Sequence, residues 1–385
     1  MASSENRLNT LVNVFSSELY QALRSDDGNL IVSPFGIQVL LAMTLEGADG
    51  KTENEIANII HHSKNDKEML KAYKAAINSL ESPNLKIATR MFVNKAVEIK
   101  SDFKALTSEY FSCEVNRKDF KKRPEECRID INKWVEKKTS QKIKDLFPED
   151  SIHADDSLVM VNAMHFYAEW QTRFEKENTI VMPFHVTPHR TVNVRMMVAC
   201  KSFHYVESEK LDAKIIKLLY SDEVFSIIIF LPNKLEGLSE TENKLKSIDL
   251  FEELSTLNQR TVNLMLPRFR IEKTIDLNNL ISQQVPTAFT DKANFPGITN
   301  GPLNISKIIQ KAFIEVNERG TEAAAATGIV LTPRSRKTVE EMKCDHPFFF
   351  QILKGGIILF QGALIEPDPE RYPTILEQGT NKFCK

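Results

Sequence analysis

Helical patterns come first in this chain and strand patterns follow, and this order limits the fold. Apolar residues recur at helical spacing in 8–23, 101–111 and 129–147. Short apolar or alternating runs bounded by Pro, Gly or Asn, which are typical of strands, occupy 225–232, 261–272 and 355–365. Because strands and helices do not alternate regularly, the order predicts an α+β fold.

The chain shows no sign of division into separate units. It has 385 residues, 42% of them apolar, and it contains no Gly/Ser or Pro linker, no repeat and no low-complexity tract. We therefore expect one continuous domain over residues 1–369, followed by a mobile tail over 370–385.

Composition excludes several classes of function. The 50 Lys and Arg residues nearly balance the 52 Asp and Glu residues, so bulk charge predicts no nucleic-acid binding. No run of about 18 apolar residues is present, which predicts no membrane span. The first residues lack a signal-peptide pattern, so we expect either an intracellular protein or one whose leader is removed. Five scattered cysteines lack metal-ligand spacing, and we expect free thiols and no metal site: Cys113, Cys127, Cys200, Cys344 and Cys384.

Sequence motifs of common enzymes are missing. The chain contains no GxSxG, GxxxxGK[ST], HExxH or strand-linked GxGxxG pattern. A triad assembled from distant residues would leave no such motif, but the absence of these motifs still counts against an enzyme. We therefore expect a protein that is not an enzyme.

The segment 316–337, VNERGTEAAAATGIVLTPRSRK, needs a separate explanation. Ala323–Ala326 would suit a helix, but the flanking residues provide neither an apolar stripe nor charge pairs. In a strand, the small side chains of Thr321, Ala323, Ala325 and Thr327 would share one face. Such a strand could enter an existing sheet without overpacking the core beneath it.

Five ordered stretches resemble the serpins, a family of serine protease inhibitors. They are residues 29–56, with Asn29, Ser33, Pro34, Gly47, Gly50 and Thr52; 131–147; 158–174, with Asn162, Phe166, Trp170 and Phe174; 311–328; and 345–367. The sequence of residues 309–327 is similar to that of arthropod members. The resemblance implies a serpin fold, in which a helix-rich N-terminal part packs on a large mixed main sheet accompanied by smaller sheets.

The resemblance also implies an exposed reactive-centre loop at about 318–340 that enters the main sheet after cleavage, a known case of strand addition. Its hinge comprises Glu318, Gly320, Thr321, Glu322, Ala323, Ala324, Ala325, Ala326 and Thr327. Counting from the hinge glycine as in the family places the reactive bond between Arg334 and Ser335, with Arg336 and Lys337 as alternatives in register. The specificity residues are then Thr332, Pro333 and Arg336.

This reading predicts a suicide-substrate inhibitor of a trypsin-like serine protease, acting as a monomer that forms a covalent complex with its target. An arginine before the cut suits a specificity pocket with a carboxylate at its base. We expect an extracellular protein of the innate-immunity type, with a cytoplasmic location as the alternative. The other function left open is a non-inhibitory serpin that acts as a carrier or chaperone.

Departures from the family pattern concern the region where the main sheet opens, which the resemblance assigns to Ser33, Asn162 and Gln310. Gly36 stands where the family usually has Ser, and Gln310 where it often has His. Gln can still hydrogen-bond to Ser33 and Asn162, but it does not titrate, so no histidine pH switch is expected there.

A run of lysines suggests a polyanion partner. Lys64, Lys67, Lys71 and Lys74 recur at spacings of three and four, which would place them on one helical face. This segment resembles the serpin helix that binds heparin in antithrombin-like members, so heparin or another glycosaminoglycan would be an activator and no cofactor would be required. The alternative is an ordinary solvated face. A second basic cluster contains Arg117, Lys118, Lys121, Lys122 and Arg123.

Overall fold

A computed structural model describes residues 4–24, 28–318 and 339–368. In these ranges the α-helices are α1 (Ser4–Leu23), α2 (Pro34–Gly47), α3 (Gly50–Ile60), α4 (Lys67–Ser79), α5 (Ser101–Phe111), α6 (Pro124–Lys138), α7 (Leu238–Leu245), α8 (Leu250–Ser255) and α9 (Asn278–Gln284). The short 3-10 helices are η1 (Lys176–Asn178) and η2 (Pro286–Phe289).

The strands are β1 (Leu30–Val32), β2 (Leu85–Asn94), β3 (Val115–Lys118), β4 (Leu158–Phe166), β5 (Ile180–Thr187), β6 (Arg190–Ser208), β7 (Ala213–Leu219), β8 (Phe225–Pro232), β9 (Asn258–Pro267), β10 (Phe269–Asp276), β11 (Ile305–Val316), β12 (Val339–Lys343), β13 (Phe348–Lys354) and β14 (Ile357–Leu364). Helices dominate before residue 140 and strands after it, so the predicted α+β fold is confirmed.

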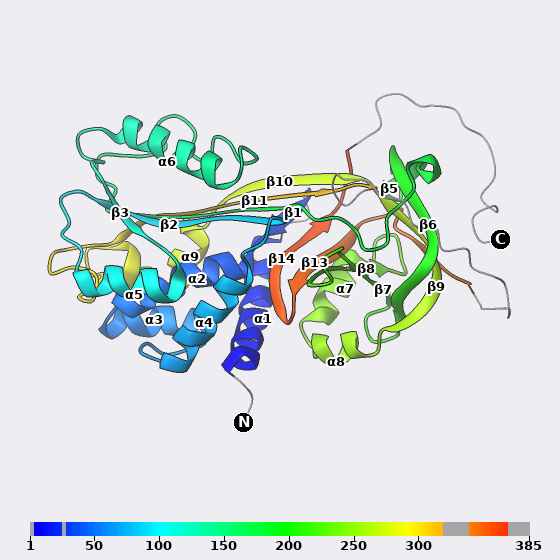
Figure 1. The fold of residues 1–385 in the computed structure, drawn as a ribbon, viewed down its shortest axis with the longest axis horizontal. Coiled ribbons are helices and arrows are strands. Elements are labelled where there is room, and N and C mark those ends of the chain that lie inside the picture. Colours follow the sequence, from blue (N-terminus) through cyan, green and yellow to red (C-terminus); the bar gives the residue numbers. More distant parts are fainter. Residues whose placement is uncertain (1–3, 25–27, 319–338, 369–385) are drawn as a thin grey trace.

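The strands form two sheets. A five-stranded sheet has the order β10-β11-β4-β2-β3 and mixes parallel with antiparallel pairs. A nine-stranded sheet has the order β1-β14-β13-β8-β7-β6-β9-β12, with β5 paired to β6. Figure 1 shows α2 to α5 and α9 below the five-stranded sheet, with α6 above it.

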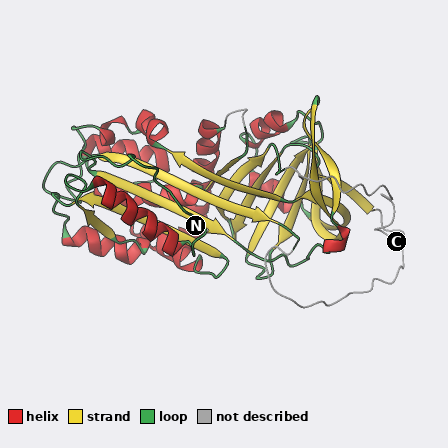
Figure 2. Ribbon diagram, turned by 90° about the horizontal axis from the view of Figure 1, so that it is seen from above, coloured by secondary structure: helices red, strands yellow, loops and turns green. Residues whose placement is uncertain are grey.

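Helix α6 covers the upper face of the five-stranded sheet and crosses its strands obliquely (Figure 2). Its buried side chains Cys127, Ile131 and Val135 pack on a small core of their own, which includes residues of β2, β4 and β11. The resemblance placed a helix of this kind on the main sheet, so the five-stranded sheet corresponds to that main sheet.

Helix α6 ends earlier than its sequence pattern predicts. The pattern covered 129–147, but the helix stops at Lys138, and Ser140 and Gln141 have φ angles of 52° and 61°. The Thr139 hydroxyl donates to the carbonyl of Val135 and accepts from the N–H of Ile143, which holds the turn after the helix. Apolar residues 143, 146 and 147 continue the pattern because the following segment also packs on the sheet.

The predicted strand over 261–272 is two strands. Pro267 ends β9 in the nine-stranded sheet, and Phe269 begins β10 in the five-stranded sheet. Arg268, which lies between them, donates its backbone N–H to the carbonyl of Arg195 on β6. One apolar run therefore connects the two sheets.

Candidate functional site

Strands β4 and β11 lie side by side in the five-stranded sheet and pair directly, in parallel, from Ile305 opposite Leu158 to Ile314 opposite Phe166. We call this line of contact the seam. All of β4 and most of β11 are buried. The chain leaves β11 at Val316 and returns as β12 in the other sheet, so the predicted reactive-centre loop connects the two sheets.

Gln310 lies at the middle of the seam, opposite Asn162, and forms three hydrogen bonds of 2.8 Å. Its Oε1 accepts from the backbone N–H of Ser33, and its Nε2 donates to the Ser33 carbonyl and to Asn162 Oδ1. Asn162 Nδ2 in turn donates to Thr89 Oγ1 on β2. Ser33, Asn162 and Gln310 are fully buried and Thr89 is half-buried, and the network joins β2, β4, β11 and the start of α2.

Gly36 makes this network sterically possible. A Cβ atom at position 36 would lie 2.4 Å from Asn162 Oδ1 and 2.6 Å from its Nδ2, a distance that real Cβ atoms do not show. The Asn162 amide therefore occupies the space of the missing side chain. Gly36 also donates its N–H to Ser33 Oγ at the start of α2.

Glu318 fixes the point where the chain leaves the seam. Its carboxylate accepts from Thr179 Oγ1 at 2.7 Å and lies 3.4 Å from Arg268 Nε, and its carbonyl accepts from the N–H of Phe174. The indole Nε1 of Trp170 donates to the preceding carbonyl of Asn317, and its ring stacks on Tyr220 at 4.5 Å. The first residue of the predicted hinge is thus held by the side chains of Thr179 and Arg268 and by the backbone of Phe174.

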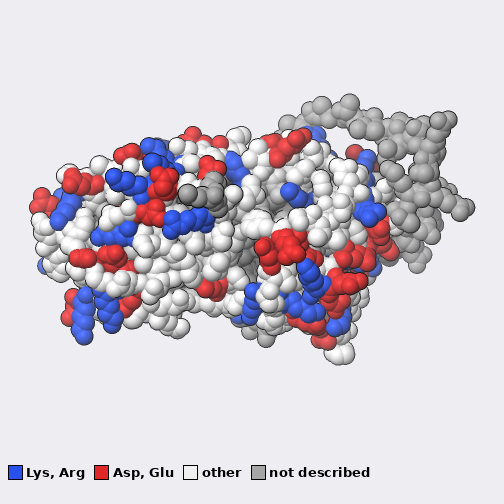
Figure 3. Space-filling model, turned by 90° about the horizontal axis from the view of Figure 1, so that it is seen from below, with Lys and Arg blue, Asp and Glu red and all other residues white. Residues whose placement is uncertain are grey.

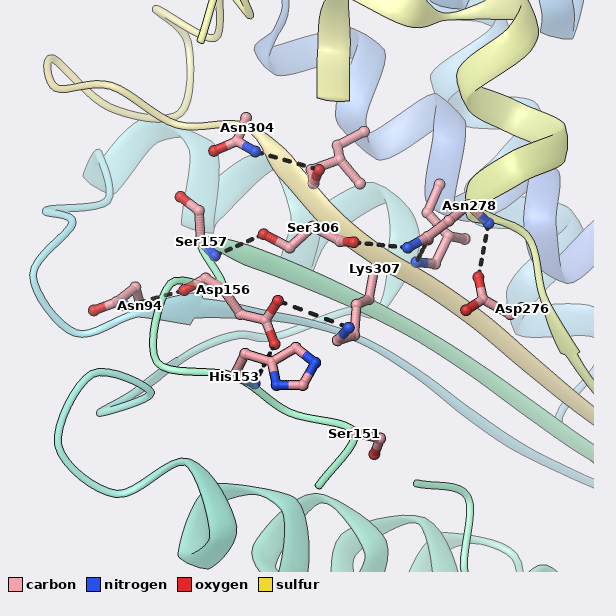
Figure 4. A network of polar contacts seen from close by, with 12 residues as sticks. Asn94, Ser151, His153, Asp156, Ser157, Asp276, Asn278, Asn304, Ser306 and Lys307 are labelled. Atoms are coloured by element: carbon pink, nitrogen blue, oxygen red, sulfur yellow. Dashed lines mark hydrogen bonds and ion pairs between the residues drawn. The ribbon is translucent and has the colours of Figure 1, made fainter. Parts of the chain in front are cut away.

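The opposite end of the seam is held by side chains, because the β4–β11 register shifts between Ile305 and Lys307 (Figure 4). Ser306 Oγ accepts from the N–H of Ser157, and Asn278 Nδ2 donates to the Ser306 carbonyl, both at 2.8 Å. Asp156 accepts from the N–H of His153 and lies 3.9 Å from Lys307 Nζ. Burial raises the pKa of Asp156.

The segment after α6 covers the seam near its hinge end. Lys311 on β11 donates to the Lys144 carbonyl at 2.7 Å and pairs with Glu272 on β10 at 2.9 Å. His165 on β4 packs on the Phe313 ring at 4.9 Å, opposite it across the seam. Burial lowers the pKa of His165 to about 4, with Lys142 and Lys86 contributing.

The structure brings Ser33, Asn162 and Gln310 into contact, and it describes Glu318 of the predicted hinge. The rest of the hinge, Arg334, Ser335 and the specificity residues lie outside the described residues. Sequence reasoning missed Thr89, Thr179 and Arg268, because only strand register and sheet topology bring these residues to the site.

Fewer lysines lie on the face of α4 than their spacing predicted. Lys64 lies before α4 and donates to the carbonyl of Ala48 at 2.6 Å, so it is not on the helix. On α4, Lys71 pairs with Glu68 at 2.9 Å and Lys74 with Glu109 at 3.6 Å. In the second cluster, Lys118 pairs with Asp130 and Arg123 with Glu126. On the face shown in Figure 3, acidic side chains are likewise interspersed among basic ones.

Cys113, Cys127 and Cys344 are buried free thiols, and burial raises the pKa of each. Cys200 is disulfide-bonded, so the prediction of free thiols is wrong for that residue. Within the described ranges, no group of three or more His, Cys, Asp or Glu side chains is placed to hold a metal ion. In the same part of the chain, no helix has the length and apolar character needed to span a bilayer.

Comparison with known proteins agrees with this geometry. The family model described as serpin (serine protease inhibitor) matches residues 10–367. Human Serpin B4 is 34% identical over 389 residues, covering 94% of this chain and 100% of the relative, and Alaserpin of Manduca sexta is 33% identical, covering 92% of each.

The crystal structure of Serpin48 from the insect Tenebrio molitor superposes with a TM-score of 0.85 at 30% identity, covering 96% of this chain and 100% of that one. The fold expected from the sequence resemblance is therefore confirmed. The match extends over the helices, both sheets and the seam between β4 and β11. The chain belongs to the serpin family of serine protease inhibitors.

Proposed function

We propose that the protein is a suicide-substrate inhibitor of a trypsin-like serine protease, which cleaves it after Arg334. The observation that carries the proposal is the closed seam. β4 and β11 are parallel neighbours, and the chain that follows β11 carries small side chains at alternate positions, from Thr321 to Thr327. A strand that folds back from Glu318 would run antiparallel to both neighbours.

Insertion of such a strand is favourable in energy. It would replace one parallel ladder by two antiparallel ladders, which pair slightly better per residue. A net gain of about ten hydrogen bonds at roughly 0.5–1.5 kcal/mol each gives about 5–15 kcal/mol. This is as large as the whole stability of an ordinary domain, so the described arrangement with a closed seam would be kinetically trapped.

Kinetic trapping of the closed seam supports inhibition, because a serine protease forms an ester with its substrate before hydrolysis. Deacylation requires an ordered oxyanion hole and catalytic triad. If the cleaved loop enters the seam while the ester still joins it to the protease, the protease is pulled along the sheet and its active site is distorted. The ester then persists.

The residue before the cut sets the target class. A guanidinium at position 334 would form a bidentate pair with a carboxylate at the base of a trypsin-like pocket. The pocket of an elastase or chymotrypsin would bury the same charge without a partner, which is costly. Thr332, Pro333 and Arg336 would contact the protease on either side of the cut.

Incubation with trypsin tests the proposal. We expect a complex that survives denaturing electrophoresis and a released peptide whose first residue is Ser335, identified by mass spectrometry. Arg334→Ala should abolish the complex, whereas Arg336→Ala, the matched control for a neighbouring arginine, should retain it. A cut after Arg336 in the parent would show that the register is wrong. Cleavage without any complex would instead favour the non-inhibitory alternative, a carrier or chaperone.

A further inference from the structure

Among the described cysteines, Cys200 takes part in a disulfide bond. This residue is half-buried and lies on β6, where β6 pairs with β9. The other described cysteines, Cys113, Cys127 and Cys344, are buried free thiols, so none of them is its partner. The sequence contains five cysteines, which leaves Cys384, outside the described residues, as the remaining cysteine of the same chain.

The end of the described chain is fixed beside the start of β6. Arg190, the first residue of β6, donates to both carboxylate oxygens of Glu366 at 2.6 and 2.5 Å. Asn29 Oδ1 accepts from the backbone N–H groups of Ile365 and Glu366, and Asn29 Nδ2 donates to the Glu366 carbonyl. The segment that follows Asp368 therefore begins next to the strand that carries the bonded cysteine.

The length of this segment is sufficient to reach Cys200. Cys200 lies ten residues after Arg190 on the same strand, which corresponds to at most about 33 Å. Asp368 and Cys384 are sixteen residues apart, and an extended chain of that length can span more than about 50 Å. The segment can thus join the two sites with length to spare.

From these observations we propose that Cys200 and Cys384 form a disulfide bond, which fastens the C-terminal tail to β6. When the bond forms, the two thiols lose two protons and two electrons. Oxidised glutathione accepts them by thiol–disulfide exchange and leaves as two molecules of reduced glutathione. The tail over 370–385, for which the sequence predicted mobility, is thereby anchored. Such a bond persists in an oxidising compartment, so it favours the extracellular location over the cytoplasmic one.

The bond changes what cleavage of the protein produces, and this consequence rests on the proposed function. A cut after Arg334 divides the chain into residues 1–334 and 335–385. The second part contributes β12, β13 and β14, which pair with β9, β8 and β1 of the first part. Without a cross-link these contacts alone hold the two parts together, and unfolding separates them. With the bond they remain one molecule, in which pairing is intramolecular.

Peptide mapping without reduction tests the bond on the uncleaved protein. The protein is equilibrated with reduced and oxidised glutathione, denatured, alkylated and digested with trypsin, which places Cys200 in peptide 196–201 and Cys384 in peptide 383–385. We expect three alkylated cysteines and the two peptides linked to each other. Reduction before alkylation should give five alkylated cysteines and no linked pair. Five alkylated cysteines without reduction, glutathione on Cys200, or peptide 196–201 linked to a second copy of itself would overturn the pairing.

Two substitutions show whether the pairing is specific. Cys384→Ser should abolish the linked pair and leave Cys200 without a partner in the chain. Cys127→Ala removes a buried free thiol on α6, so it should keep the linked pair and leave two alkylated cysteines. A Cys384→Ser protein in which Cys200 is linked to another of its own cysteines would show that the assigned partner is wrong.

Retention of the cleaved segment needs a separate measurement, with the inhibitor in excess so that no free trypsin remains. On denaturing gels without reductant, the complex formed by the parent should retain residues 335–385, and reductant should release them. The complex of Cys384→Ser should release them under both conditions. Release from the parent without reductant would overturn the covalent retention. Failure to form any complex would overturn the proposed function, whereas the peptide map still decides the pairing of Cys200.

Discussion

Replacing Gln310 by Leu tests whether the polar network at the middle of the seam holds β4 against β11. The two side chains are similar in size, so the change removes hydrogen bonds without opening a large cavity. The orientation of the Gln310 amide is fixed by its partners, because the Ser33 N–H can only donate and therefore faces Oε1.

The expected loss of stability in Gln310→Leu follows from the polar groups that lose a hydrogen bond to the Gln310 amide. Leu at position 310 leaves the Ser33 N–H and Asn162 Oδ1 without their partner at a fully buried site, and the Ser33 carbonyl keeps only its bond from the Ile37 N–H. An unsatisfied buried group costs about 1–3 kcal/mol, and with partial relaxation we expect a loss of about 3–6 kcal/mol. For a chain of this length, that corresponds to a fall in Tm of about 4–8 °C.

Differential scanning calorimetry measures the loss, and Gln351→Leu provides a matched control. Gln351 is also buried in a sheet, but its amide makes only one long contact, 3.5 Å from Nε2 to Gln361 Oε1, and its own Oε1 has no partner among the described residues. The control should lose less than about 1 kcal/mol. Gln310→Leu should also lose inhibitory activity faster at 37 °C, as the seam opens spontaneously. Equal Tm values for the two variants would refute the reasoning.

Three further predictions concern the hinge, the basic face and the buried histidine. Thr321→Arg should turn the inhibitor into a substrate, because an inward-facing charge stalls insertion; cleavage continues, but complex bands on denaturing gels disappear, and a normal complex yield would contradict the insertion argument. Replacing Lys67, Lys71 and Lys74 by Ala should lower the salt concentration at which the protein elutes from heparin, while inhibition without heparin stays intact; unchanged elution would identify these lysines as a solvated face. His165 has a folded pKa of about 4, below its unfolded value, so the unfolded chain binds the proton first as pH falls. The parent should therefore lose about 3 kcal/mol more than His165→Phe between pH 7 and pH 4 in urea titrations, and parallel pH profiles would count against the burial of a neutral imidazole.

Elements with a clear local pattern could be read from the sequence. The helix over 101–111 and the strand over 225–232 begin and end as predicted, because capping, spacing and flanking Pro residues act locally. Helix α6 ended early because Ser140 and Gln141 adopt left-handed backbone angles, whereas the apolar pattern continued into the next segment. Periodicity reports which residues are buried, and it does not report whether the backbone between them stays helical.

The sequence indicated only some residues of the candidate site, and it did not indicate why they meet there. The resemblance named Ser33, Asn162 and Gln310, and the structure joins them. It gave Gly36 only as a departure, whereas the structure shows that the Asn162 amide fills the position of its Cβ atom. Lys64 illustrates the opposite failure, since its spacing fits a helical face but α4 begins three residues later. Contacts between distant segments decide both cases.

The pairing of β1 with β14 has a consequence for synthesis of the protein. Leu30–Val32 pairs with Gln361–Ala363, and Ser16 on α1 hydrogen-bonds to Gln361, so the first elements of the chain are completed by the last. Roughly 300 residues separate them, which at about 5–20 residues per second is roughly 15–60 s of translation. During this interval α1 and β1 emerge from the ribosome without their partner strand. Chaperone binding to residues 8–45 on nascent chains should therefore end only after β14 has emerged.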